Sequence, residues 1–444
     1  MIFQQSNLNP EPRTLNPWLS RFLAALGIGL ALSTAHADNW PQWRGEKLDG
    51  VSREANVPTK WSKTDNVAWR LPLPGPAGAT PVVWDDRIYL TSVAGDDKQE
   101  LALLCVSTDG KLLWQQTVAS GSKDVRNDEG NFASPSPSTD GRHVWAFFGT
   151  GDLACYTKDG QPVWKFNVQD RYGKLNIQFG MASTPVLDRG RLYLQLIHGD
   201  MRTKNQEARA VCLDAATGSE IWQVGRPSDG TFECKHSYAS PTIYRDAERE
   251  FLLTHGADYI VAHDLGDGRE LWRCGDLNPK GKYEPTLRFV ASPVAVPGFI
   301  VVPTAKNYGV VCLKPDGSGD LTERPEYTHW RWKSNTPDVP SPLVVGDLVY
   351  LCRENGNLIC ADAKTGQEYY TQPTTRDRHR ASPVFAGGNV YLTARNGAIT
   401  VVRAGKQFEV VAKNELGEPT SASPVVSGGR IYVRTFAALY AIGK

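Results

Sequence analysis

A short unit that recurs eight times along the chain constrains the fold more than any other feature of the sequence. In its clearest copy, residues 381–402, apolar and β-branched stretches alternate with glycine-containing turns, which is typical of three short β-strands in succession. Each copy has a proline eight residues before an aromatic or apolar strand residue, and proline is tolerated at the first residue of a strand. The pairs are Pro81/Tyr89, Pro137/Trp145, Pro185/Tyr193, Pro293/Val301, Pro342/Tyr350, Pro383/Tyr391, Pro424/Tyr432 and, two residues longer, Pro241/Phe251.

A second signal follows these strands in five of the copies. A third strand leads to a glycine turn, and four residues after the glycine comes a tryptophan, or in one copy a tyrosine. Each unit therefore has four expected strands, named here A, B, C and D in chain order. Four strands in about 40–50 residues are typical of a β-propeller blade, and successive prolines lie 41–56 residues apart. The glycine and aromatic pairs are Gly110/Trp114, Gly160/Trp164, Gly218/Trp222, Gly268/Trp272 and Gly366/Tyr370.

The two ends of the repeat array predict how it closes. The last unit begins at Pro424 and ends at Lys444, which leaves room for strands A, B and C but not for D. A lone strand that contains Trp69 is expected at residues 66–71, and it would complete the eighth blade and cover an exposed sheet edge. The expected fold is all-β: a single eight-bladed β-propeller of four-stranded blades over residues 65–444, closed by this N-terminal strand. A linear solenoid would leave both end features unexplained.

The first 64 residues lack the repeat. Arg13 and Arg21 precede an apolar run at 22–32, and a site with small residues follows it, which is the order of a secretory signal peptide. The run has 11 residues, whereas a membrane-spanning helix needs about 20. We therefore expect residues 1–37 to be removed by cleavage after Ala37, giving a periplasmic or secreted protein with no transmembrane or lipid anchor. Residues 38–64 are expected to form a Trp-rich extension.

Charge and cysteine usage limit the classes of function. With 49 basic and 48 acidic residues, the chain gives no reason to expect a nucleic acid or an anionic membrane as a partner. Five of the eight cysteines recur at one position before the C–D turn, where small packing residues are expected. Cys234, Cys274 and Cys352 remain, and the sequence leaves open whether one pair forms a disulfide. No metal-binding spacing of cysteine or histidine is present, so no metal site is expected.

Several segments carry a resemblance to a known family. The C-to-D segments at 212–222 and 360–366, which run Cys-x-Asp-Ala-x-Thr-Gly, resemble the tryptophan-docking repeats of pyrroloquinoline quinone (PQQ) propellers. The segments at 40–45 (WPQWRG) and 49–52 (DGVS) are similar to the opening of secreted bacterial PQQ-like repeat proteins. The resemblance covers nearly the whole chain after residue 37. It implies the fold more than the chemistry, because the repeat residues dock blades together.

The resemblance implies two classes of function. In the quinoprotein dehydrogenases of this family, two adjacent cysteines stack on PQQ, a Glu/Asn/Asp set holds calcium and an Asp is the base. No two cysteines are adjacent here, and lone acids such as Glu284 and Asp338 are expected to be solvated. We therefore expect no catalytic residue and no bound cofactor, with a PQQ-dependent dehydrogenase as the alternative. The expected function is that of an exported, non-catalytic binding or assembly module, similar to the propeller of the outer-membrane protein assembly machinery.

Basic residues gather in the loops that are expected on one face. In a propeller, the B–C and D–A loops share a face, and the loop before strand A opens at the mouth of the central channel. Arginine forks bind carboxylate or phosphate groups in two-pronged fashion. We therefore expect a basic rim that binds a protein, an anionic small molecule or a glycan. The candidate residues of this basic rim are His236, Arg288, Lys306, Arg353, Arg380 and Arg395.

Overall fold

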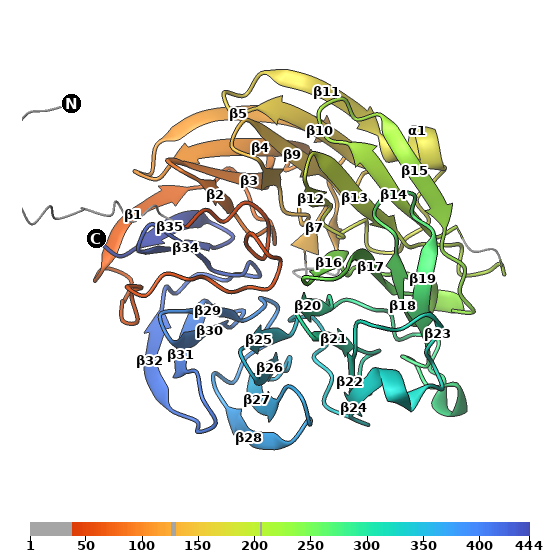
Figure 1. Cartoon of the computed structure of the whole chain (residues 1–444). Coiled ribbons are helices and arrows are strands. Elements are labelled where there is room, and N and C mark those ends of the chain that lie inside the picture. Colours follow the sequence, from red (N-terminus) through yellow and green to blue (C-terminus); the bar gives the residue numbers. More distant parts are fainter. Residues whose placement is uncertain (1–37, 126–129, 205–206) are drawn as a thin grey trace, which may run out of the picture. The chain divides into compact units, whose positions relative to one another are not determined.

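The computed structural model describes residues 38–125, 130–204 and 207–444, so the predicted signal peptide lies outside the described residues. Every element described below belongs to one compact unit, Ala37–Lys444. In this part of the chain, eight sheets follow one another around a centre as the blades of a β-propeller (Figure 1). The predicted all-β, eight-bladed fold is confirmed.

Each blade is an antiparallel sheet whose strand A begins at the residue after one of the eight prolines. The A strands of most neighbouring blades contact one another, so they form the innermost layer around the channel. The blades are β2 (Val82–Trp84), β3 (Arg87–Ala94), β4 (Glu100–Ser107) and β5 (Leu112–Ser120); β8 (Ser138–Thr139), β9 (His143–Phe147), β10 (Asp152–Thr157) and β11 (Pro162–Asn167); β12 (Val186–Asp188), β13 (Arg191–Leu196), β14 (Arg209–Asp214) and β15 (Glu220–Gly225); β16 (Thr242–Arg245), β17 (Glu250–Gly256), β18 (Tyr259–His263) and β19 (Glu270–Cys274); β20 (Val294–Val296), β21 (Phe299–Pro303), β22 (Val310–Leu313) and β24 (Thr328–Arg331); β25 (Leu343–Val345), β26 (Leu348–Cys352), β27 (Asn357–Asp362) and β28 (Glu368–Pro373); β29 (Val384–Ala386), β30 (Asn389–Thr393), β31 (Ala398–Arg403) and β32 (Val410–Glu415); and β33 (Val425–Ser427), β34 (Arg430–Arg434), β35 (Ala438–Ile442) and β1 (Val67–Pro72).

Short elements occupy the loops between blades. A hairpin of β6 (Asp124–Val125) and β7 (Gly130–Asn131) follows the first blade, and the helix α1 (Val168–Tyr172) follows the second. Among the described residues, no helix has the length and apolarity that a membrane crossing requires. Single 3-10 turns lie at Phe232–Lys235, Lys280–Lys282 and Pro325–Tyr327.

The aromatic residue of strand D joins one blade to the next. A Cβ added at Gly160 would lie 2.9 Å from the Trp114 ring of the preceding blade, so a side chain there would collide with the indole. The indole N–H of Trp114 donates to Lys158 O at 2.9 Å. The glycine turn thus forms a flat surface for the ring and an acceptor for its only donor. Equivalent contacts join Trp69 to Gly110, Trp164 to Gly218, Trp222 to Gly268 and Trp330 to Gly366.

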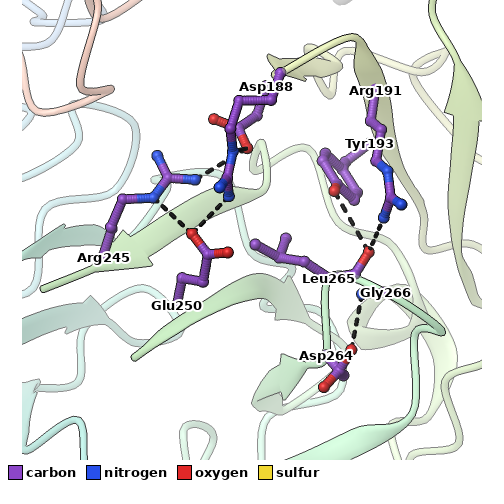
Figure 2. A network of polar contacts seen from close by, with 9 residues as sticks. Asp188, Arg191, Tyr193, Arg245, Glu250, Asp264, Leu265 and Gly266 are labelled. Carbon is purple, nitrogen blue, oxygen red and sulfur yellow. Dashed lines mark hydrogen bonds and ion pairs between the residues drawn. The ribbon is translucent and has the colours of Figure 1, made fainter. Parts of the chain in front are cut away.

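The junction between the third and fourth blades shows how charged residues reinforce this docking (Figure 2). Arg191 Nη1 donates to Leu265 O at 2.6 Å, the same carbonyl that accepts the docked indole. Arg245 lies 3.0 Å from Asp188 and 2.8 Å from Glu250. The acidic A–B turn residue Asp188 is therefore paired across the junction rather than free in solvent.

The predicted closure by the Trp69 strand is confirmed. Strand β1 pairs antiparallel with β35, with Trp69 opposite Ala441 and Leu71 opposite Leu439, and Figure 1 shows the two strands side by side. The indole of Trp69 lies on the Gly110 turn of the first blade and donates to Thr108 O at 2.8 Å. The two ends of the repeat array therefore share one blade, and that blade docks on the first.

A closed ring of hydroxyl groups surrounds the channel. The residue before each strand A proline is Ser or Thr, and its backbone N–H donates to the hydroxyl oxygen of the equivalent residue in the next blade, at 2.8–3.2 Å. All eight residues are buried, so each bond satisfies a backbone donor that water does not reach. In ring order, the members are Thr80, Ser136, Thr184, Ser240, Ser292, Ser341, Ser382 and Ser423, whose N–H returns to Thr80.

The N-terminal extension crosses the channel at its A–B end. Trp40, which is 2% exposed, exchanges two backbone hydrogen bonds of 2.8 Å with Val83 in β2. Gln42 Oε1 accepts from Leu187 N in β12, and the Arg44 guanidinium donates to Pro342 O at 2.7 Å. Further along, Ser52 N donates to Phe385 O in β29. Since these partners lie on innermost strands of blades around the ring, the segment covers this end of the channel. Trp40 thereby packs on the body of the propeller.

The fifth blade departs from the predicted repeat. Between β22 and its D strand β24, the chain inserts β23 (Gly319–Asp320), which pairs in parallel with β19 of the fourth blade and makes that sheet five-stranded. The Trp272 indole N–H has no hydrogen-bond partner among the described residues. The docking residue of the fifth blade is Trp330. The glycine spacing does not predict it, because the insertion with β23 leaves no glycine four residues before this tryptophan.

Candidate functional site

The open mouth of the channel contains the candidate site. The D–A and B–C loops there surround a cavity of about 330 Å³, called here the channel-mouth pocket. Part of the pocket lining, called here the apolar wall, is apolar and aromatic, and the ring centroids of Phe179 and Tyr238 are 6.0 Å apart. The D–A loops supply this wall because each leads into an innermost strand. The residues of the wall are Phe179, Met181, Tyr238, Val290 and Val339.

Other residues of the pocket lining are charged, and these charges are paired with carboxylates or cations of the protein. Lys306 Nζ lies 3.0 Å from Asp338 Oδ2 and 3.2 Å from Glu354 Oε2. Arg380 Nη1 lies 2.7 Å from Glu354 Oε1. Lys306 and Asp338 belong to loops of the fifth blade, whereas Glu354 and Arg380 lie in loops on either side of strands C and D of the sixth. The network therefore ties neighbouring loops together at the channel mouth.

The ionisation of this network follows from its contacts. Burial by itself would raise the pKa of Glu354, but hydrogen bonds and attraction from Arg380 and Lys306 outweigh it and lower this pKa to about 2. Burial raises the pKa of Asp338, against the opposing attraction of Lys306. Burial also disfavours the charge on Lys306, yet the two carboxylates raise its pKa above the usual value. With an ammonium or guanidinium on each carboxylate, neither acid is arranged as a free base or metal ligand.

Arg288 is the third basic-rim residue in the pocket. Its Nη1 lies 2.6 Å from Glu233 Oε2, and its guanidinium lies 4.7 Å from the centroid of the Phe179 ring. The ion pair and the cation–π contact hold the arginine between two D–A loops. Its charge is therefore balanced within the protein.

The structure does not bring all six basic-rim residues together. Arg288, Lys306 and Arg380 line the channel-mouth pocket, and Arg353 lines an adjoining cavity of about 450 Å³ that also contacts Lys306. His236 is 1% exposed, its Nε2 lies 3.0 Å from Gly199 O, and burial lowers its pKa, so it supplies no surface cation.

Arg395 is the other residue outside the pocket. It is 7% exposed, and its guanidinium lies 4.1 Å from the Phe436 ring centroid, which places it at the junction of the seventh and eighth blades. The expected convergence on one rim thus holds for three residues, with a fourth next to them.

The acidic partners are the functional residues that sequence reasoning missed. Asp338 was expected to be solvated, but it binds Lys306. Glu233 and Glu354 carry the remaining counter-charges. A signal was present, because like charges that converge at a channel mouth need acidic neighbours. Three of the basic-rim residues, Arg288, Lys306 and Arg380, are therefore paired with carboxylates of the protein.

The cysteines are all within the described residues and all are free, buried thiols. Burial raises the pKa of Cys234 to about 12 and that of Cys274 to about 11, so neither is a thiolate near neutral pH. The disulfide that the sequence left open among Cys234, Cys274 and Cys352 is not formed. Among the described residues, no group of three or more His, Cys, Asp or Glu side chains is placed to hold a metal ion.

Solved structures share this architecture at low sequence identity. BamB from Moraxella catarrhalis has a TM-score of 0.60 and 12% identity, with 85% of this chain and 97% of that chain covered. A europium-containing methanol dehydrogenase has a TM-score of 0.64 and 12% identity, with 90% of each chain covered. The quinohemoprotein alcohol dehydrogenase ADHIIG from Pseudomonas putida HK5 has a TM-score of 0.60 and 13% identity, with 91% and 80% covered. At these identities the likeness shows the fold alone.

Sequence comparison goes further than the structural likeness. No curated protein has a matching sequence. One family model, described as outer membrane protein assembly factor BamB, matches residues 51–194 and 149–407, which together span most of the propeller. The repeat, the blade number and this match agree. The chain belongs to the family of the outer membrane protein assembly factor BamB.

Proposed function

We propose that this protein is an exported, non-catalytic propeller that binds a polypeptide partner at the channel-mouth pocket and serves in assembly. Membership of the BamB family supports a role of this class. The observation that carries the proposal is the composition of the pocket: its lining combines an apolar wall, with Phe179 and Tyr238, and a set of ion pairs that are already balanced. Aromatic, methionine and arginine side chains are enriched at protein–protein interfaces.

The charge balance favours a polypeptide over a small anion. Each cation that lines the pocket has a carboxylate within 3.2 Å: Lys306 with Asp338, Arg380 with Glu354, and Arg288 with Glu233. A small anion gains little attraction from these cations, because a carboxylate already offsets the charge of each one. A polypeptide instead presents apolar side chains to the apolar wall and both donors and acceptors to the ion pairs.

The alternative function, a PQQ-dependent dehydrogenase, fits the residues poorly. Calcium beside the cofactor needs carboxylates that are free to bind it, and here Lys306 and Arg380 neutralise Asp338 and Glu354. The adjacent cysteines that stack on the quinone in these dehydrogenases have no counterpart in the sequence. We therefore assign no step to the quinone.

A urea-unfolded outer-membrane β-barrel protein, labelled with a fluorophore and diluted into the propeller, tests the proposal by anisotropy. Val290→Asp and Val339→Asp place a charge on the apolar wall without removing an ion pair, and each is expected to weaken binding at least about tenfold. Val163→Asp, on the 42% exposed Val163 of β11, is the matched control and should bind as the parent does. Equal binding by all three variants, or none by the parent, would refute the proposal.

Export is tested separately. Protein isolated from the periplasm or medium of its native host is expected to begin at Asp38, as N-terminal sequencing would show. Recovery of the chain from the cytoplasm with residues 1–37 intact would contradict export.

A further inference from the structure

The D strand is the outermost of the four strands A to D in each blade, and seven of the eight D strands carry a charged residue or a proline. Charges and prolines on an edge discourage another chain from pairing with it, because a charge is desolvated and a proline lacks the N–H donor. The charged residues include Arg70 in β1, Lys165 in β11, Glu220 in β15, Arg331 in β24, Glu368 in β28 and Lys413 in β32, and also Arg273 in β19, whose edge is covered by β23.

Strand β5 of the first blade is the exception. Its sequence, LLWQQTVAS, has neither a charged residue nor a proline, and at nine residues it is the longest D strand. Leu112 and Leu113 are 50% and 46% exposed, the two highest values among the large apolar side chains of the described residues. No strand of the described chain pairs with the outer edge of β5. The edge is therefore long, open and without a charged residue of its own, and it has exposed leucines at its start.

The fourth blade shows how such an edge is occupied. Strand β23 lies on the outer edge of β19, with Gly319 opposite Trp272 and Asp320 opposite Arg273. Leu321 N then donates to Arg273 O at 2.7 Å. At this position of a blade, the propeller thus accepts an extended segment as a fifth strand, supplied in this case by its own chain.

Local features bound the part of β5 that can be paired. The register with β4 shifts between Leu112 and Trp114 and again next to Val118. In addition, the Lys165 ammonium of the second blade binds Val118 O. Regular pairing covers residues 114–117 between these points. An added strand would therefore pair with about these four residues, and its flank would lie over the exposed leucines.

We propose that the outer edge of β5 binds an extended, uncharged polypeptide segment, which adds to the first blade as a fifth strand. Main-chain N–H and C=O groups supply the affinity, and Leu112 and Leu113 contact one apolar side chain of the segment. The absence of charge within β5 favours an uncharged segment, since a charged residue placed against residues 114–117 would lose water and find no charged residue of β5 as a partner. The inference rests on the proposed function, because it gives the bound polypeptide a second contact away from the pocket.

The probe is a fluorescein-labelled ten-residue peptide of alternating threonine and valine, and its partner probe has two central residues N-methylated. The parent is expected to bind the first peptide and to bind the N-methylated one at least about tenfold more weakly, because N-methylation removes main-chain donors. Leu113→Lys should also weaken binding at least about tenfold. Ile221→Lys is the matched control in β15, since Ile221 is 42% exposed and also precedes a docked tryptophan. Hydrogen exchange of the amides at 114–117 should slow when the peptide binds.

Three results would overturn the inference: no peptide binding by the parent, equal binding of the N-methylated peptide, or unchanged binding by a folded Leu113→Lys variant. Val339→Asp separates this inference from the proposed function. If Val339→Asp weakens binding of the unfolded β-barrel protein but the peptide does not bind as expected, the proposed function is supported and the β5 site is refuted. If the peptide binds as expected and Val339→Asp binds the unfolded β-barrel protein as tightly as the parent does, the β5 site is supported and the proposed binding at the pocket is refuted.

Discussion

The two ends of the central channel are built in opposite ways. At the A–B end, the extension is held by backbone hydrogen bonds and by buried side chains, among them Trp40 and Arg44. At the other end, loops from several blades meet through ion pairs such as Lys306–Asp338, in which the side chains are 45% and 19% exposed. The first end is a packed core and the second is a partly hydrated surface.

This difference indicates that the two ends of the channel contribute differently to the stability of the fold. Buried apolar contacts contribute several kcal/mol per residue, whereas exposed ion pairs contribute about 1 kcal/mol or less. The extension end is therefore expected to determine stability. The channel-mouth pocket can change its side chains at small cost in stability, which suits a binding surface.

The largest test of the comparison is the removal of residues 38–72, which contain both the extension and β1. The variant loses the docked, half-buried Trp69 and the buried Trp40, and a buried tryptophan such as Trp40 contributes about 3–5 kcal/mol. We expect aggregation, or a melting temperature more than about 10 °C below that of the protein beginning at Asp38, measured by circular dichroism. A melting temperature within a few degrees of the parent would contradict the claim that β1 and the extension stabilise the propeller.

A single substitution at each end sharpens the comparison. Trp40→Ala is expected to lower the free energy of unfolding by about 3–5 kcal/mol in urea denaturation, because the side chain is 2% exposed. Val339→Ala in the half-buried pocket wall should cost less than about 1 kcal/mol. If the two substitutions lowered the free energy of unfolding by similar amounts, the channel-mouth end would contribute as much to stability as the extension end does.

The smallest expected effect is pH-dependent. The pKa of Glu354 is about 2 in the folded protein, below the ordinary glutamate value of 4.5, so its ion pairs stabilise the fold above pH 4.5 and cease to do so as pH falls toward 2. Glu354→Gln should therefore cost on the order of 1 kcal/mol at pH 7 and little near pH 2. The exposed Glu415→Gln is the control in the same urea titrations. A cost for Glu354→Gln that persists unchanged at pH 2 would contradict the proposed ionisation.

The blades were predictable because the repeat places residues at fixed spacing. A proline before strand A, a glycine at the C–D turn and a tryptophan in strand D each meet a local steric need, so the positions are readable without coordinates. The docking role of Trp330 was not predictable, because the insertion that contains β23 breaks this spacing. The route of residues 38–54 across the channel was also not predictable, since its partners lie in the innermost strands of several blades.

The candidate site was predictable only in part. The sequence identified which loops share a face, and Arg288, Lys306 and Arg380 do line one pocket there. It did not show that Glu233 pairs with Arg288 across 55 residues, or that Glu354 reaches both Lys306 and Arg380. Such pairs depend on distances between loops of different blades, and a single sequence carries no periodic signal for them.

The hydroxyl ring has a consequence for how the protein comes apart. A linear array can fray from its terminal repeats, whereas in this ring the bond from Ser423 to Thr80 is of the same kind as the other seven. No blade is first or last, so none can leave without breaking two joints at once. Circular permutants cut in any loop between blades would keep all eight joints. The joint between Ser423 and Thr80, where the two ends of the repeat array meet, is therefore equivalent to the joints between the other blades.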